Sequence, residues 1–342
     1  ETGAVLKTAF CGPCFGAGDT PANNAFSIRH STRNFPNREG SKLQNGQIAS
    51  VALMDARSIA ATAANKGVLT PATDFDGTIG KYKYHFDSNI YANRVFDSKG
   101  VADPSVEIHF GPNIKDWPEM RPLSDDILLK VVSEIHDPVT TTDELIPSGE
   151  TSSFRSNPLG LAEFTLSRKD PAYVGRAKAV RDRSEEVKAE VSRAEKILEE
   201  KYPEFKGRIE KAGLGSTIYA VKPGDGSARE QAASCQRVLG AAANIASDYA
   251  TKRYRSNLIN WGMIPFLYKQ GDTAATENLP FANGDYIFVP GAKKMIAEKL
   301  PGVKAYAVRA DGTTAEFELA TGDMTDDERK IIQAGCLINF YR

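Results

Sequence analysis

Two short stretches near the start of the chain decide how the sequence is interpreted: Cys11-Gly12-Pro13-Cys14 and Ser31-Thr32-Arg33-Asn34-Phe35-Pro36-Asn37-Arg38. The glycine and proline between the two thiols permit a tight bend, so both sulfur atoms can face the same side. Arg33 and Arg38 follow on a polar, turn-rich segment, and their planar guanidinium groups suit carboxylates and phosphates. Thiol ligands close to anion-binding arginines predict a metal centre that acts on a carboxylate substrate.

The Cys11–Cys14 pair has two other interpretations, a redox dithiol and half of a zinc site. A thioredoxin-type dithiol opens a helix after a strand, whereas residues 15–21 carry two glycines and a proline, which disfavour a helix. The sequence contains no second Cys-x-x-Cys, which a four-sulfur zinc site needs. The dithiol therefore remains an alternative to the metal centre.

Length and composition limit the classes of protein. The chain has 342 residues, of which 41% are hydrophobic, enough for two domains with their own cores. Its net charge is −1, which argues against bulk attraction to nucleic acid or a membrane surface. The mean hydropathy is −0.37 and no apolar run reaches membrane-spanning length. Four cysteines make no disulfide framework, so we predict a cytoplasmic protein in which Cys235 and Cys336 are buried thiols.

The chain length and the position of its prolines predict two parts joined by a linker. Residues 1–112 form the first part and residues 123–342 form the second. The segment 113–122 between them is the expected linker, because Pro118 and Pro122 interrupt any regular element there.

Local patterns predict the main elements of both parts. Close spacing of small and apolar residues predicts a helix over 48–64, with Gly67 just beyond its end. Runs rich in β-branched or aromatic residues predict strands over 127–135, 216–221 and 286–289.

Three further helices are expected in the second part. Residues 173–202 are rich in charge but carry an apolar stripe at helical spacing, with Ser184 as a plausible N-cap. Residues 292–300 form another helix. Thr325 and Glu328 form the capping box of the last one.

Two later motifs carry side chains suited to chemistry. In Thr140–Pro147, Asp143 is either an ordinary turn carboxylate or a functional group. In Gly224–Ala233, glycines precede Ser227, which we expect to cap a helix whose first N–H groups can bind an anion. A plain N-cap is the alternative for this serine.

Taken in order, these motifs resemble the aconitase superfamily. That family carries Cys-Gly-Pro-Cys followed by Asn-Arg-Asn-Phe-x-Gly-Arg, then Thr-Thr-Asp-His-Ile, then Gly-x-Gly-Ser-Ser-Arg-Glu-His-Ala. The sequence departs from this pattern at several positions. Among them, Thr32 and Glu144 replace an asparagine and a histidine, and Ala228 and Gln231 replace a serine and a histidine. Since two substrate contacts differ, the resemblance does not extend to citrate or isocitrate as the substrate.

The resemblance implies a fold and a cofactor. The fold is α/β, with residues 1–112 as the remnant of a three-layer α/β/α domain and residues 123–342 as a swivelling β/β/α domain. The family holds a 4Fe–4S cluster by three cysteines; Cys11 and Cys14 match two of them. The third ligand and the acid–base histidines belong to a preceding part of the family's chain. We therefore expect the missing N-terminal domains of the same protein as partners, and an isolated 342-residue chain without turnover.

The resemblance also assigns roles. The chain would be a hydro-lyase that eliminates water from, or adds it to, a small di- or tricarboxylate. Ser227 would be the catalytic base, Arg229 would support the developing charge, and Asp143 would orient its partners near the active site. The substrate would be held by residues in three of the segments: Thr32, Arg33, Arg38, Arg155 and Ala228. Unaided by the resemblance, Arg155 would be taken for a surface arginine.

Two alternatives remain open at this point. One is a catalytically silent or regulatory relative, including an RNA-binding one, although near-zero net charge disfavours nucleic acid. The other is the dithiol oxidoreductase, which requires Cys11 and Cys14 on a strand-to-helix turn. Whether the candidate residues face one cleft distinguishes these alternatives from the hydro-lyase.

Overall fold

The computed structural model describes residues 23–30, 50–77, 83, 85–93, 98–107, 109, 114–147, 151, 154–268 and 278–342. The chain divides into two compact units. The first comprises Glu1–Ile114 with Gly149–Arg155, and the second comprises Lys115–Ser148 with Ser156–Arg342.

In the first unit, a short parallel pair of strands precedes a helix. The strand β1 (Phe26–Arg29) pairs with β2 (Ser50–Leu53), and α2 (Ala56–Ala64) follows. Asp55 caps α2 by accepting hydrogen bonds from the backbone N–H groups of Arg57 and Ser58. The predicted helix over 48–64 is therefore wrong in its first part, because pairing with β1 holds residues 50–53 extended. The described residues of this unit also include two short helical segments, η1 (Ala72–Asp74) and α3 (Asn89–Ala92).

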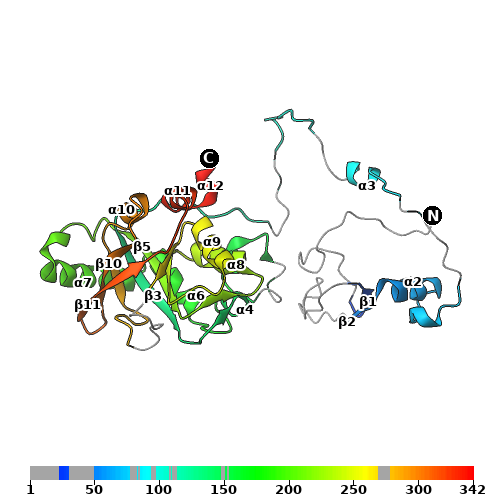
Figure 1. Cartoon of the computed structure of the whole chain (residues 1–342), viewed down its shortest axis with the longest axis horizontal. Helices are drawn as coiled ribbons and strands as arrows, with labels where there is room; N and C mark the ends of the chain where they lie inside the picture. The colour runs from blue at the N-terminus through cyan, green and yellow to red at the C-terminus, as the bar shows by residue number, and fades with distance from the viewer. Residues whose placement is uncertain are drawn as a thin grey trace. The chain divides into compact units, whose positions relative to one another are not determined.

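The second unit is built around a closed seven-stranded barrel with the order β10-β11-β8-β7-β5-β3-β9 (Figure 1). Four neighbouring strands run parallel: β3 (Ile127–Ile135), β5 (Gly213–Ala220), β7 (Ala241–Ala246) and β8 (Ile264–Leu267). Three antiparallel strands close the barrel: β9 (Tyr286–Val289), β10 (Gly302–Val308) and β11 (Thr314–Ala320). The chain is thus of the mixed α/β class, as the sequence predicted.

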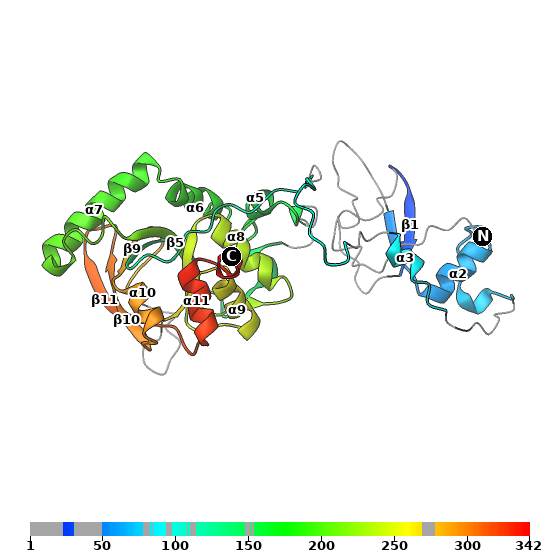
Figure 2. The same cartoon turned by 90° about the horizontal axis from the view of Figure 1, so that it is seen from above.

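Helices flank this barrel on several sides, as the two views show (Figures 1 and 2). They are α5 (Pro158–Ala162), α6 (Tyr173–Arg181), α7 (Glu185–Lys201), α8 (Arg229–Val238), α9 (Lys252–Asn260), α10 (Ala292–Ala297), α11 (Asp326–Ala334) and α12 (Leu337–Phe340), with the 3-10 turn η3 (Pro203–Phe205) after α7. A separate pair of short strands, β4 (Thr140–Thr141) and β6 (Pro223–Asp225), lies next to α4 (Thr142–Leu145).

Apolar burial explains why the barrel forms. Strand β3 is buried at nearly every position, which is typical of a parallel strand covered on both faces. Its residues Leu129 and Val131 join Ile245, Phe266 and Ile287 in one core cluster, each fully buried. Each such side chain contributes about 1.5–3 kcal/mol to folding. Charged side chains at these positions would destabilise the barrel.

Several predicted elements are confirmed. The predicted strands over 127–135, 216–221 and 286–289 correspond to β3, β5 and β9. Ser184 caps α7, and the capping box of Thr325 and Glu328 begins α11. The helix expected after Ser184 is confirmed as α7, and the charged segment before it contains a further helix, α6. Helix α10 ends at Ala297, short of residue 300.

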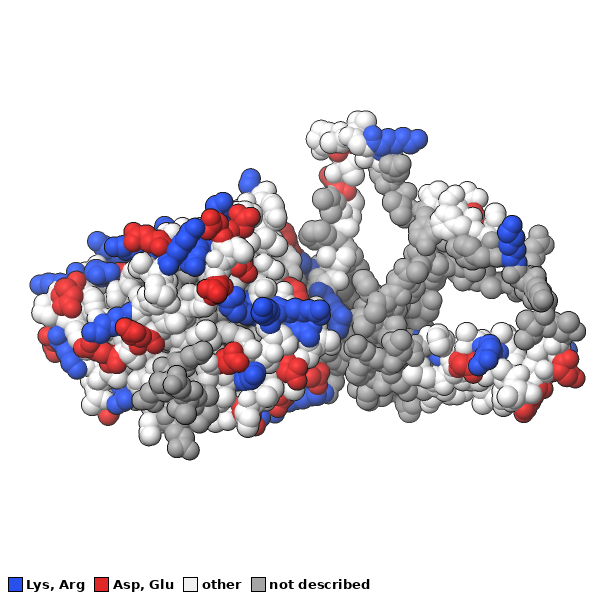
Figure 3. Space-filling view, viewed as in Figure 1, with Lys and Arg blue, Asp and Glu red and all other residues white. Residues whose placement is uncertain are grey.

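The surface carries both signs of charge. In Figure 3, Lys and Arg side chains are interspersed with Asp and Glu side chains over the visible face of the second unit. This distribution agrees with the net charge of −1. Among the described helices, none combines the length and the apolar character that a bilayer span requires.

Candidate functional site

The candidate site in the second unit is the loop that joins β6 to α8, residues Gly224–Ala228. It follows the carboxyl end of β5, the edge of an open or closed parallel sheet at which ligands bind in many α/β proteins. The second candidate segment, Thr140–Asp143, follows the carboxyl end of β3. Since β3 and β5 are parallel neighbours, both segments lie at the same end of the barrel.

Pairing between β4 and β6 brings these two segments side by side. Thr140 pairs with Pro223 and Thr141 pairs with Asp225. Gly226 has a φ of +131°, and a Cβ placed on it would lie 2.2 Å from Oγ1 of Thr142. The loop can approach the start of α4 this closely only because residue 226 is glycine.

Gly224 fixes the other side of the loop. Its φ is +99°, and an added Cβ would lie 2.3–2.4 Å from atoms of the Tyr254 side chain. Tyr254 is fully buried, and its hydroxyl oxygen accepts hydrogen bonds of 2.9 Å from both Gln236 Nε2 and Asn244 Nδ2. Oγ1 of Thr251 also donates to the Gly224 carbonyl oxygen over 3.1 Å. The loop is therefore held against a rigid polar core.

Ser227 is not the N-cap that the sequence predicted. The N-cap of α8 is Ala228, which has no side-chain hydrogen bond to give, and Ser227 precedes it as an exposed residue. The positive φ angles of Gly224 and Gly226 set the loop so that the chain enters the helix one residue later than expected. Consequently the Ser227 hydroxyl is not used in capping, and no described residue accepts or donates a hydrogen bond to it.

Arg229 begins α8 as a half-buried arginine whose charge lacks a carboxylate partner among the described residues. Its Nε atom is buried without a hydrogen-bond partner there. A buried, unpaired donor costs about 1–3 kcal/mol, more for a charged group, so it is retained only where something else uses it. An anion bound beside the loop would supply the missing acceptor.

Glu230 and Trp261 form a pair that the sequence did not reveal. Trp261 Nε1 donates to Oε1 of Glu230 over 2.8 Å, and the Trp261 ring packs on Trp117 with centroids 4.3 Å apart. Burial raises the pKa of Glu230, while the hydrogen bond from Trp261 acts in the opposite direction. The carboxyl group directly after Arg229 is thus held by a tryptophan and leaves the arginine's charge uncompensated.

Replacing Glu230 by glutamine is expected to stabilise the protein at pH 7. The pKa of Glu230 is higher in the folded than in the unfolded chain, so the unfolded chain loses the carboxyl proton first as the pH rises above about 4.5. The free energy of unfolding therefore falls with rising pH until the folded-state pKa is passed. Glutamine removes that loss and still accepts from Trp261. Urea unfolding should show a gain at pH 7 that disappears near pH 4.

A matched control is Glu185→Gln. Glu185 also stands in the first turn of its helix, but its side chain is 90% exposed. We expect no gain from that change, because an exposed carboxylate at a helix N-terminus is favourable. An equal gain from both changes would contradict the assignment of the effect to burial of Glu230.

Asp143 and Glu144 have defined partners. Asp143 Oδ2 accepts from Nη1 of Arg168 over 2.6 Å, and its side chain is half exposed. Glu144, which replaces the family's histidine, closes a capping box with Thr141 at the start of α4. Hydrogen bonds from Thr141 and Lys169 lower the pKa of Glu144 against the opposing effect of burial. Glu144 is therefore a structural carboxylate.

The remaining candidates are distributed as follows. Arg155 is a half-buried residue at the end of the Gly149–Arg155 segment, which groups with the first unit. The other candidates from the first part lie outside the described residues: Cys11, Cys14, Thr32, Arg33 and Arg38. The structure thus brings together the segments of Asp143, Ser227, Ala228 and Arg229 and describes no more of the site.

The described residues offer no metal site of their own. They contain no group of three or more His, Cys, Asp or Glu side chains that could hold an ion. Cys235 and Cys336 are free and buried, as predicted, and burial raises the pKa of the Cys235 thiol. A thiol that resists ionisation is a poor metal ligand. The Cys11–Cys14 pair is therefore the candidate source of thiolates in this chain.

Comparison with known families finds two matches, one in each part of the chain. The family described as aconitase (aconitate hydratase) matches residues 1–61, and the aconitase C-terminal domain matches residues 177–271. The chain belongs to the aconitase superfamily. At the level of the family it is therefore a chain of a hydratase or dehydratase. The first match contains the Cys11–Cys14 pair and the second contains the loop with Ser227.

A solved structure is also similar to this superfamily chain. It is the crystal structure of 3-isopropylmalate dehydratase from Methanocaldococcus jannaschii, with a TM-score of 0.36 and 20% sequence identity. The alignment covers 63% of this chain and 93% of that one.

Proposed function

We propose that this chain contributes to a 4Fe–4S-dependent hydro-lyase that interconverts a hydroxy-di- or tricarboxylate and its unsaturated acid. The observation that carries the proposal is the loop of Ser227 and Arg229. It presents an exposed hydroxyl beside a half-buried arginine without a described carboxylate partner, at the carboxyl ends of β3 and β5. Membership of the aconitase superfamily supplies the reaction class.

In this proposal the chain's own residues move a proton and hold charge. Ser227 accepts the proton from the substrate carbon, and Arg229 stabilises both the serine alkoxide and the carbanion-like substrate. Arg33, Arg38 and Arg155 bind the substrate carboxylates and fix its orientation. Thr32 and Ala228 lie at substrate contacts, and Asp143 orients neighbouring groups through Arg168.

Cys11 and Cys14 are the proposed cluster ligands of this chain. When bound, a 4Fe–4S cluster with one iron free of protein ligand supplies Lewis acidity toward the substrate hydroxyl and a carboxylate. The donor chemistry of the pair fits, because soft thiolates select iron–sulfur clusters. Of the four cysteines, Cys235 and Cys336 are buried, so a third thiolate would come from a different polypeptide segment.

Iron–sulfur reconstitution tests this arrangement. We expect the 342-residue chain alone to retain less than one cluster after desalting and to show no hydration of aconitate-like acids. Cys14→Ala should lower the retained iron to background, because one thiolate cannot hold a cluster. Cys235→Ala is the control and should retain as much iron as the unchanged chain, since Cys235 is buried away from solvent.

Three outcomes would overturn the proposal or part of it. Equal iron retention by Cys14→Ala and the unchanged chain would remove the cysteine pair as ligands. A stable, fully occupied cluster with turnover in this chain alone would refute the need for an external thiolate. Disulfide reduction by the iron-free chain that is lost in Cys14→Ala would favour the dithiol oxidoreductase instead.

A further inference from the structure

A second feature of the barrel lies at the end opposite the Ser227 loop. A cavity of about 400 Å³ opens at the amino ends of β3 and β5, where Ile127 and Gly213 begin these strands. The Ser227 loop follows their carboxyl ends. Strand β5 has 8 residues, so the cavity and the loop are separated by roughly 25 Å at about 3.3 Å per residue. The cavity is therefore separate from the proposed catalytic site.

The lining of this cavity is rich in positive charge. Its cationic side chains outnumber its carboxylates: Arg121, Arg181, Arg183, Lys211 and Arg237 against Glu119 and Glu210. The helices α6 and α8 end at the cavity, and each helix C-terminus carries about half a negative charge. The two helix ends therefore offset about one positive charge, and Asp182, which pairs with Arg181, offsets another, so a net charge of about +1 remains.

Arg237 is the most constrained of these cations. Its Nη1 donates to the carbonyl oxygen of Ala241 over 3.1 Å, and its Nη2 donates to those of Arg121 and Gly335 over 2.9 and 3.2 Å. All these acceptors are neutral, and burial lowers the pKa of Arg237 to about 10. A half-buried guanidinium that meets only carbonyl groups leaves its charge to be balanced by something else.

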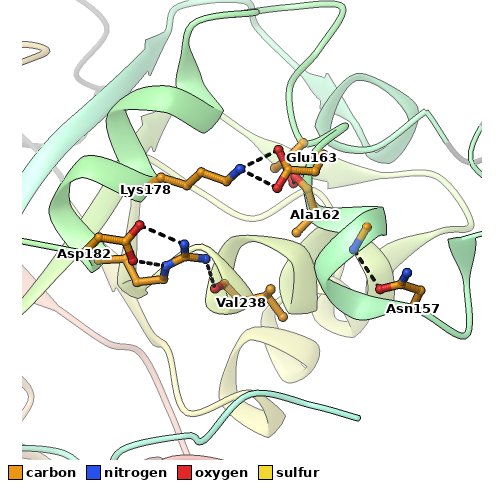
Figure 4. Close-up of polar contacts among 9 residues, drawn as sticks. Asn157, Ala162, Glu163, Lys178, Asp182 and Val238 are labelled. Carbon is orange, nitrogen blue, oxygen red and sulfur yellow. Dashed lines mark hydrogen bonds and ion pairs between the residues drawn. The ribbon is translucent and has the colours of Figure 1, made fainter. Parts of the chain in front are cut away.

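The other cations differ in how they are held. Arg181 donates to both carboxylate oxygens of Asp182, over 2.7 and 3.0 Å, and to the Val238 carbonyl oxygen over 3.5 Å (Figure 4). Arg121, Arg183 and Lys211, in contrast, form no ion pair with any residue that the structure describes. Three side chains at the cavity are thus available to bind an anion.

The wall of the cavity is fixed before any ligand binds. Asn339 Nδ2 donates to the Met120 carbonyl oxygen over 2.7 Å, and the Leu123 N–H donates to that of Gln333 over 3.1 Å. Together with the bonds from Arg237, these contacts hold the segment 118–124 against α11 and α12. A wall that is already ordered lowers the entropic cost of binding a small molecule.

We propose that this cavity binds a small organic dianion, a phosphate monoester or a dicarboxylate. The three lining cations without a described ion pair, Arg121, Arg183 and Lys211, can balance two negative charges, and arginine forks suit both groups. The side chains of Leu123, Ile127 and Leu214 provide an apolar surface for the organic part. The volume lies within the range of small-molecule sites.

Titration calorimetry on the 342-residue chain tests the proposal, with inorganic phosphate, phenyl phosphate and succinate as separate probes at low salt. The variant Arg183→Gln/Lys211→Gln removes two cations that make no described ion pair, so folding should be preserved. We expect its Kd for the bound probe to rise at least tenfold. The control, Lys188→Gln/Lys196→Gln, removes two exposed charges from α7 and should leave Kd within about twofold.

Each outcome decides the question. Binding of phenyl phosphate but not succinate would identify the phosphate ester, and the reverse would identify the dicarboxylate. If none of the three probes binds at about 10 mM, ten times a Kd of about 1 mM, the proposal is overturned. Equal Kd values in the two double variants would also overturn it. Arg229→Ala should leave this binding unchanged, and a loss there would place the anion at the Ser227 loop instead.

Discussion

Replacing Arg229 by alanine is expected to lower kcat about 10²- to 10³-fold in the reconstituted holoenzyme. This is the cost of removing one preorganised donor from a developing negative charge, about 2.7–4 kcal/mol. The prediction rests on the proposed role of Arg229 beside Ser227. Because the interaction forms mainly in the transition state, KM should change much less than kcat, which steady-state kinetics will show.

The same change should hardly affect folding. Arg229 has no ion pair with a described residue, and its buried Nε lacks a partner, so little stabilising interaction is lost. We expect the free energy of unfolding not to decrease, because the change also removes a buried, unpaired donor whose cost is about 1–3 kcal/mol. Arg193→Ala on α7, which loses a hydrogen bond to the Ala310 carbonyl oxygen far along the chain, is the control and should retain full activity. A parallel loss of stability and activity in Arg229→Ala would assign this arginine a structural role.

Sequence patterns predicted three of the seven barrel strands, β3, β5 and β9, because burial on both faces leaves a local trace; β7, β8, β10 and β11 were not predicted. Residues 127–135 are nearly all buried. A run of apolar and β-branched residues predicts such a strand even when the strands that pair with it are unknown. Capping is similarly local, so Thr325 and Glu328 were identified correctly. The strand over 50–53 was missed because only its pairing with β1 distinguishes it from the start of the following helix.

The candidate site was predictable only in part, for the same reason. The glycine-serine loop and Arg229 are adjacent in the sequence, and the order of the motifs along the chain resembles that of the family. The position of Ser227 before the N-cap depends on the close approach of Gly224 to the Tyr254 side chain, which lies thirty residues later. The Glu230–Trp261 hydrogen bond also joins distant positions, and no spacing rule connects them. Contacts of this kind follow from the tertiary fold, which local periodicity does not encode.

Gly262→Ala is expected to have the largest effect on stability. A Cβ on Gly262 would lie 1.9 Å from the carbonyl oxygen of Gly335, so backbone would meet backbone and no side chain could move aside. Gly262 also has a φ of +70°, which costs a residue with a Cβ about 1–2 kcal/mol. Adding about 1–3 kcal/mol for overpacking predicts a total loss of roughly 2–5 kcal/mol.

Gly207→Ala separates these two contributions. Gly207 has the same φ of +70°, but nothing lies within 4 Å of an added Cβ. Urea unfolding should therefore show a loss of about 1–2 kcal/mol for Gly207→Ala and a distinctly larger one for Gly262→Ala. Equal losses would mean that the contact between Gly262 and Gly335 is loose. Since Arg237 donates to the Gly335 carbonyl oxygen, a shift of that carbonyl would also disturb the cationic cavity, and anion binding there should weaken in Gly262→Ala but not in Gly207→Ala.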